Sequence, residues 1–157
     1  MQATAVERGE PATRGSSGAV AGMPRAWLRV EGIAALSAGV GLYLHLGGSL
    51  IWLIPLLLAV DVSIAGYLAG PRPGAHLYNL AHNWATGVAV LALAWWLGLP
   101  QLALVGAILV AHTGMDRVAG YGLKYATAFG DTHLSQKGHR SLDSAPLASS
   151  RLERLSA

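Results

Sequence analysis

Hydrophobic residues gather in four long stretches of the chain, and short polar turns separate them. Each stretch approaches the ~20 residues that an α-helix needs to cross about 30 Å of hydrocarbon. The pattern therefore predicts an all-α, polytopic membrane protein in which four transmembrane helices form a small antiparallel bundle. The predicted helices cover residues 26–46, 50–69, 76–97 and 99–118.

Polar segments flank the four stretches. Residues 1–25 contain scattered charges and no apolar run long enough for a signal peptide, so we expect a disordered N-terminal lead there. Residues 141–157 are rich in Ser and Ala, and we expect a disordered tail. The ordered transmembrane domain is therefore expected to span residues 26–118, followed by an interfacial segment over residues 119–140.

The basic residues all fall on one side of the predicted bundle. The first and third turns contain none of them, the second turn contains one, and the others lie at or beyond the two ends of the domain. By the positive-inside rule this side faces the cytoplasm. We therefore expect a multi-pass protein of the bacterial cytoplasmic (inner) membrane with cytoplasmic N- and C-termini. The 11 residues are Arg8, Arg14, Arg25, Arg29, Arg72, Arg117, Lys124, Lys137, Arg140, Arg151 and Arg154.

The composition agrees with a location in lipid and limits the chemistry. Only 12% of the residues are charged, against roughly 25% in soluble domains. Cysteine is absent, which excludes disulfides, thiolate metal ligands and covalent haem attachment. Topology explains the formal net charge of +3, because the basic residues flank the apolar stretches. The expected partner is the lipid bilayer, and no nucleic-acid partner is expected.

A few polar side chains lie inside the apolar stretches. A charge at mid-bilayer costs at least about 2.5 kcal/mol, so these groups should face one another inside the bundle. At 1.5 Å per residue, Glu31 and His112 lie about 7 Å from the cytoplasmic ends of their helices. By the same count His82 lies about 10 Å deep and Asp61 about 14 Å deep. A single polar layer is therefore expected, made of Glu31, Asp61, Asn79, His82, Asn83, His112 and Asp116.

Two interpretations of this layer stay open. In the first, the layer binds a divalent metal such as Zn, Mn or Fe, because carboxylates and imidazoles suit these ions and helical bundles house carboxylate metal centres. The expected ligands are Asp61, His82, His112 and Asp116. In the second, the same groups form a hydrogen-bonded network that fixes the helix register. The spacing of these residues along the sequence does not distinguish the two interpretations, because neither of the metal-binding motifs Glu-x-x-His and His-Glu-x-x-His occurs.

An aromatic stripe marks the segment that follows the last apolar stretch. Its aromatic residues recur at i, i+4 and i+8, which predicts an amphipathic helix at headgroup level with Lys124 snorkelling beside it. Asp131 and His133 follow. If flanking glycines fold them back over the polar layer, they would act as catalytic acid or base; alternatively, Asp131 or Thr132 caps a helix end. The aromatic residues are Tyr121, Tyr125 and Phe129.

These features support different functions. The first is a membrane-embedded, metal-dependent enzyme that acts on a lipid or other hydrophobic substrate from the cytoplasmic side. The second is a non-enzymatic membrane module, such as a scaffold, a homo-oligomer-forming subunit or a partner-binding protein. A proton or ion path is least favoured, because the outer half offers no relay beyond His45. The sequence does not decide whether the chain is an enzyme, and it names neither the metal nor the substrate.

Three long motifs contain most of these polar residues: LRVEG at 28–32, DVSIAGYLAGPRPGAHLYNLAH at 61–82 and AHTGMDRVAGYGLKYATAFGDTHL at 111–134. In these motifs the chain resembles a bacterial integral membrane family, domain-of-unknown-function family 4260. The resemblance covers about residues 26–139. It implies the fold and a membrane location, and it implies no catalytic residues because the family has no established activity.

Overall fold

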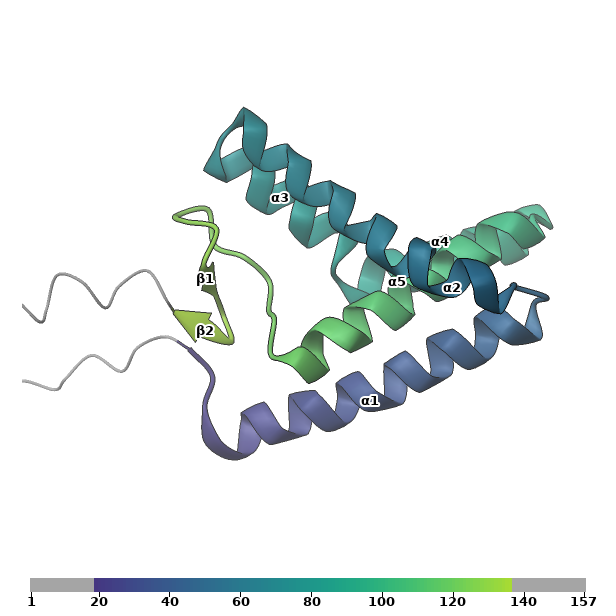
Figure 1. Cartoon of the computed structure of the whole chain (residues 1–157), viewed down its shortest axis with the longest axis horizontal. Coiled ribbons are helices and arrows are strands. Elements are labelled where there is room, and N and C mark those ends of the chain that lie inside the picture. The colour runs from purple at the N-terminus through teal and green to yellow at the C-terminus, as the bar shows by residue number, and fades with distance from the viewer. Residues whose placement is uncertain (1–18, 137–157) are drawn as a thin grey trace, which may run out of the picture.

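The computed structural model describes residues 19–136, which are helical apart from the C-terminal segment (Figure 1). The helical elements are α1 (Gly22–His45), α2 (Leu50–Ala59), the 3-10 helix η1 (Val60–Ala69), α3 (Pro71–Ala81), α4 (Trp84–Leu97) and α5 (Pro100–Ala119). Strands β1 (Asp131–Thr132) and β2 (Ser135–Gln136) pair in an antiparallel hairpin. Helix α1 begins inside the expected N-terminal lead. The rest of that lead, up to residue 18, and the expected tail over residues 141–157 lie outside the described residues.

Two of the four predicted helices are interrupted. The stretch over residues 50–69 changes from α-helix to 3-10 helix at Val60. The stretch over residues 76–97 is not one helix, because α3 and α4 meet at a 52° bend. The side-chain oxygen of Asn83 accepts a hydrogen bond from the Thr86 N–H at 2.9 Å and so caps α4. The cap starts a new helix at a position where a continuous one was predicted.

The apolar helices are compatible with a membrane protein. Two helical stretches are long and apolar enough to cross a membrane, Leu50–Ala69 and Pro100–Ala119, and the bent α3–α4 pair adds a third if it is one broken span. Helix α1 is not among them. Its first half carries Arg25, Arg29 and Glu31, which reduce its apolar character. The count of four spans therefore stays a prediction.

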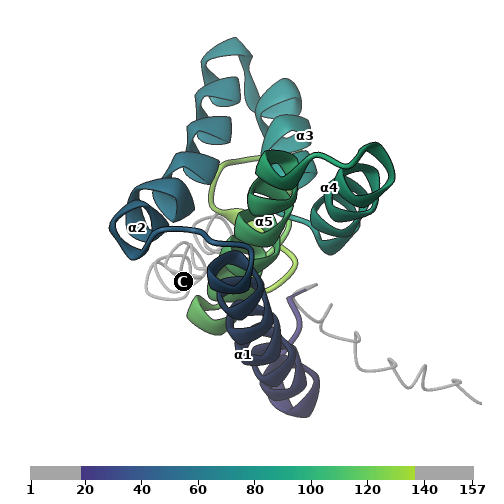
Figure 2. The same ribbon diagram turned by 90° about the vertical axis from the view of Figure 1, so that its right-hand side faces the viewer.

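Helix α5 is the central element of the fold. Figure 2 shows it surrounded by α1, α2 and α4. Small residues allow α1 to approach it closely: a Cβ atom on Gly114 would lie 2.5 Å from the Leu36 nitrogen, and one on Gly39 would lie 2.6 Å from the Ala111 nitrogen. Such contacts are typical of helix packing in membranes. The buried apolar core beside this contact consists of Tyr43, Leu57, Ala107, Ile108 and Ala111.

This close contact makes two glycines sensitive to a single added methyl group. Gly39→Ala and Gly114→Ala are each expected to lower the free energy of unfolding by about 1–3 kcal/mol, because the backbones must move apart. Gly41→Ala is the matched control, since a Cβ there meets nothing within 4 Å. Thermal unfolding in detergent measures the effect. A Gly39→Ala protein as stable as Gly41→Ala would contradict the packing.

The segment after α5 is a loop and a hairpin. Gly120 ends α5 with a φ of +87°, and a Cβ on Gly122 would lie 2.6 Å from the His133 Nδ1 atom. These two glycines turn the chain back, so the amphipathic helix expected here is wrong for residues 120–136. Figures 1 and 2 show the segment returning between the η1–α3 pair and the end of α5.

Candidate metal centre

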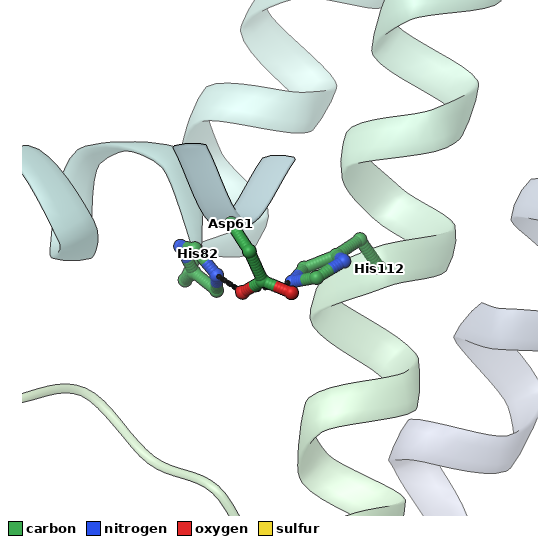
Figure 3. A group of neighbouring side chains, drawn as sticks. All are labelled: Asp61, His82 and His112. Atoms are coloured by element: carbon green, nitrogen blue, oxygen red, sulfur yellow. Dashed lines mark hydrogen bonds and ion pairs between the residues drawn. The ribbon is translucent and has the colours of Figure 1, made fainter. Parts of the chain in front are cut away.

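The helix interruptions bring polar side chains from distant parts of the chain together (Figure 3). Asp61 lies at the start of η1, His82 at the bend between α3 and α4, and His112 on α5. One ligand atom from each of these three residues lies within 4.8 Å of the others. Asp116 lies one turn further along α5 and contacts both imidazoles. The structure thus brings together all four residues that the sequence suggested as metal ligands.

The two imidazoles point their Nε2 atoms toward both carboxylates. His82 Nε2 lies 3.3 Å from Asp61 Oδ1 and 3.8 Å from Asp116 Oδ2. His112 Nε2 lies 3.6 Å from the same Asp61 oxygen and 3.7 Å from Asp116 Oδ1. Asp61 therefore offers one oxygen to both imidazoles, whereas Asp116 contacts them through two different oxygens.

Backbone carbonyl groups hold both imidazoles by their other nitrogen. His82 Nδ1 lies 2.9 Å from the Tyr78 carbonyl oxygen, and His112 Nδ1 lies 2.8 Å from the Leu57 carbonyl oxygen. A carbonyl oxygen can only accept, so each Nδ1 carries the hydrogen, and Nε2 of the neutral ring is an acceptor. Carboxylates are acceptors as well. With both rings neutral, the two Nε2 atoms and the two carboxylates that face them are therefore all acceptors, an arrangement that a cation completes.

The burial of these groups strengthens this reading. His82 and His112 are 0% exposed, and the Asp116 side chain is 10% exposed. The buried His112 Nε2 atom has no hydrogen-bond partner, although buried polar atoms nearly always have one. The Asp61 side chain is 41% exposed. The site is therefore closed on the α5 side and accessible beside Asp61.

Tyr78 supports the centre from α3. Its hydroxyl donates to Asp116 Oδ2 at 2.8 Å, and its ring stacks on His82 with centroids 3.7 Å apart. Groups that hydrogen-bond to metal ligands orient them and tune their affinity. The sequence analysis missed Tyr78. Its spacing of four residues before His82 was the available signal, because it puts both residues on one helix face.

Lys124 attaches the returning segment to α3. Its backbone N–H donates to the Asn79 side-chain oxygen at 2.7 Å, and the Asn79 amide donates back to the Lys124 carbonyl at 2.9 Å. The ammonium lies 3.6 Å from the ring centroid of Phe129 and 4.6 Å from that of Tyr78. The expected snorkelling is wrong, because Lys124 is 8% exposed. Burial lowers the pKa of Lys124, and the carboxylate of Asp116 opposes that shift.

The other candidate residues lie apart from this cluster. Asp131 is buried in the hairpin, where it accepts a hydrogen bond from the Thr127 hydroxyl at 2.9 Å. His133 Nδ1 accepts from the Leu123 N–H at 2.9 Å. These contacts hold both side chains within the returning segment, and their roles as acid or base stay predictions. Glu31, expected in the same layer, is exposed on α1.

His133 gives the returning segment a pH dependence. Burial lowers the pKa of its imidazole and nearby Arg117 lowers it further, and protonation of Nδ1 would break the hydrogen bond from the Leu123 N–H. Below its usual pKa of about 6.5, an unfolded chain binds a proton that the folded segment does not, so the segment loses stability as the pH falls. Amide exchange protection of residues 122–134, corrected for intrinsic rates, should drop between about pH 7.5 and about pH 5.5. His133→Asn, which can still accept from Leu123, should flatten the profile; an unchanged profile would contradict this role.

Comparison with known proteins places the chain in a family. Its residues 25–136 match the family model described as Domain of unknown function (DUF4260), which spans nearly all of the described structure. No curated protein matches the chain, and no solved structure matches it. Because the family description assigns no activity, the chemistry of the site rests on the geometry of these residues. The chain belongs to the DUF4260 family.

Proposed function

We propose that this protein binds one divalent metal ion inside the membrane and uses it to act on a hydrophobic or lipid substrate. The ligands are Asp61, His82, His112 and Asp116. The observation that carries the proposal is the convergence of two imidazole Nε2 atoms, each fixed through its Nδ1 hydrogen, on two carboxylates.

The spacing of the donors supports this assignment. Two ligands at about 2.1 Å from a tetrahedral metal lie about 3.4 Å apart. The four imidazole–carboxylate distances run from 3.3 to 3.8 Å, close to this spacing. One ligand atom each from Asp61, His82 and His112 also lies within 4.8 Å of the others. Nitrogen and carboxylate donors suit Zn²⁺, Mn²⁺ and Fe²⁺. A bound ion of this kind polarises a substrate oxygen or activates water, and the half-exposed Asp61 marks the side from which a substrate would enter.

Metal analysis of the detergent-purified chain tests this proposal. After exposure to Zn²⁺, Mn²⁺ or Fe²⁺ and removal of excess metal, we expect about one ion per wild-type chain and a large loss in Asp61→Asn. His76→Ala is the matched control, because His76 is an exposed histidine on α3, the helix that ends directly before His82. Wild type without stoichiometric metal, or an equal loss in His76→Ala, would refute the site.

We further propose four spans with both termini on the cytoplasmic side. In support, the Arg25 guanidinium lies 3.2 Å from the position of a Cβ on Gly120, so the start of α1 and the end of α5 share one end of the fold. Arg72 lies in the first turn of α3, directly after η1. Because the chain has no cysteine, single-cysteine variants report cleanly on sidedness. A membrane-impermeant maleimide should label Ser49→Cys in intact cells and Arg72→Cys only after permeabilisation, and the opposite pattern would overturn the orientation.

The same distances also support a second candidate function. If both imidazoles are protonated, they form ion pairs with Asp61 and Asp116 at 3.3–3.8 Å, and the cluster then only fixes the helix register of a scaffold or homo-oligomer. In that case Asp61→Asn changes stability or oligomeric state, and a chelator has no effect on the wild type. The response to a chelator therefore separates the two candidates.

A further inference from the structure

Two buried cations lie beside the proposed metal centre without a carboxylate in ion-pair contact. Lys124 is 8% exposed and Arg117 is 4% exposed. The Lys124 ammonium donates to the Phe129 carbonyl at 2.8 Å. The Arg117 guanidinium donates to the carbonyls of Tyr121 and His82 at 2.8 and 3.4 Å. In the described part of the chain, no carboxylate oxygen lies within ion-pair distance of either cation.

The two carboxylates of the proposed ligand set are balanced by the two buried cations beside it before a metal binds. The carboxylates of Asp61 and Asp116 match the cations Lys124 and Arg117, and both imidazoles are neutral when only Nδ1 carries hydrogen. A divalent ion then adds two positive charges that have no counter-charge. Because uncompensated charge is costly away from water, the metal-loaded centre favours an anionic ligand.

Lys124 is positioned to bind that anion. Its ammonium lies 4.6 Å from the ring centroid of Tyr78, whose hydroxyl donates to the ligand Asp116, and an ammonium has two donors left after one hydrogen bond. Another buried carboxylate, Asp131, lies in the hairpin and accepts a hydrogen bond from the Thr127 hydroxyl. The Asp61 side chain is 41% exposed, so the site is accessible from this side.

We infer that the substrate carries a phosphate monoester whose oxygens bind both the metal and the Lys124 ammonium. This inference rests on the proposed metal centre. A phosphate monoester carries roughly two negative charges and three acceptor oxygens at neutral pH, which matches the charge excess of the metal-loaded site. A carboxylate supplies only one charge. Phosphate chemistry is shared by a lipid headgroup such as phosphatidic acid and by free phosphate.

The test uses the full chain, purified in detergent and loaded with Co²⁺, whose visible absorption reports its ligands. Inorganic phosphate and dihexanoyl phosphatidic acid should each change the spectrum saturably, and dihexanoyl phosphatidylcholine, a phosphate diester, should bind more weakly. Lys124→Met should weaken binding of both monoester probes at least about tenfold, because a charge-assisted hydrogen bond is lost. Lys124→Arg should restore it. Arg72→Met, at an exposed position in the first turn of α3, is the matched control and should bind like wild type.

The outcomes separate this inference from the metal proposal. The inference is overturned if neither monoester probe changes the Co²⁺ spectrum, or if Lys124→Met binds the probes as tightly as wild type. Either result leaves the proposed metal centre unaffected. No site spectrum in wild type overturns both. If Lys124→Met loses the Co²⁺ site, Lys124→Gln, which can still donate to the Phe129 carbonyl, replaces it, and loss of the site in both variants overturns the inference. Tighter binding of phosphatidic acid than of phosphate assigns a lipid headgroup, and the reverse order assigns free phosphate; both support phosphate recognition.

Discussion

The double variant His82→Ala, His112→Ala is expected to lose metal binding together with the stability that the metal gives to the wild type. A ligand that binds only the folded state at 100 to 1,000 times its dissociation constant stabilises that state by about 3–4 kcal/mol. The expected effect of a chelator on wild type is therefore a drop in Tm of roughly 10 °C, given about 2–4 °C per kcal/mol for a chain of this size. The double variant should melt at the same temperature with and without the chelator.

The chain offers a matched control for this experiment. His45 and His76 are both exposed, so a variant with both replaced by alanine also loses two imidazoles but keeps the proposed ligands. It should respond to the chelator as wild type does. If the chelator leaves the wild-type Tm unchanged, the result would instead favour the second candidate, in which the clustered residues form ion pairs that fix the helix register.

Tyr78→Phe is expected to weaken metal binding by about 10–100-fold while leaving all four ligands in place. The lost hydroxyl donates to Asp116 Oδ2 at 2.8 Å, and without it the carboxylate is free to rotate away from the metal. The phenylalanine ring can still stack on His82, so the packing against this imidazole is retained. Competition with a chromophoric chelator measures the change in affinity.

Tyr67→Phe is the comparison for this substitution. The Tyr67 hydroxyl is buried and has no hydrogen-bond partner in the described structure, so its removal breaks no contact with a ligand. The metal affinity of Tyr67→Phe should stay within about threefold of the wild-type affinity. This corresponds to a change in binding free energy below the 1.4 kcal/mol of a tenfold difference. If the two phenylalanine variants bind metal equally well, the Tyr78 hydroxyl does not orient Asp116 for metal binding.

The first and last helices of the chain could be predicted from the length of their hydrophobic stretches and from the turn residues that flank them. Helices α1 and α5 begin and end within four residues of the stretches expected at 26–46 and 99–118. The interruptions inside the two middle stretches could not be predicted in this way, because hydropathy does not report which backbone hydrogen bonds form. The sequence showed only that Asn83 is a residue type that favours helix starts; it did not show that Asn83 caps a helix here.

The depth of residues along helices predicted part of the candidate site. A fixed rise per residue puts Asp61, His82 and His112 near one level, and the structure places them together. The same argument failed for Glu31, because depth does not fix the rotation of α1 about its axis, and this rotation leaves Glu31 exposed. The position of Lys124 depends on contacts with α3, 45 residues away along the chain, which no local pattern predicts.

X-ray absorption at the Zn K-edge of the Zn²⁺-loaded chain tests the central claim most directly. The proposed centre predicts four nitrogen or oxygen neighbours at about 2.0–2.2 Å, together with the outer-shell scattering of two imidazoles. The His82→Ala, His112→Ala variant should not retain Zn²⁺ at this site, so any zinc that it still carries should show no imidazole scattering from the centre. A wild-type spectrum without imidazole scattering, or one that the double substitution leaves unchanged, would contradict the proposed centre.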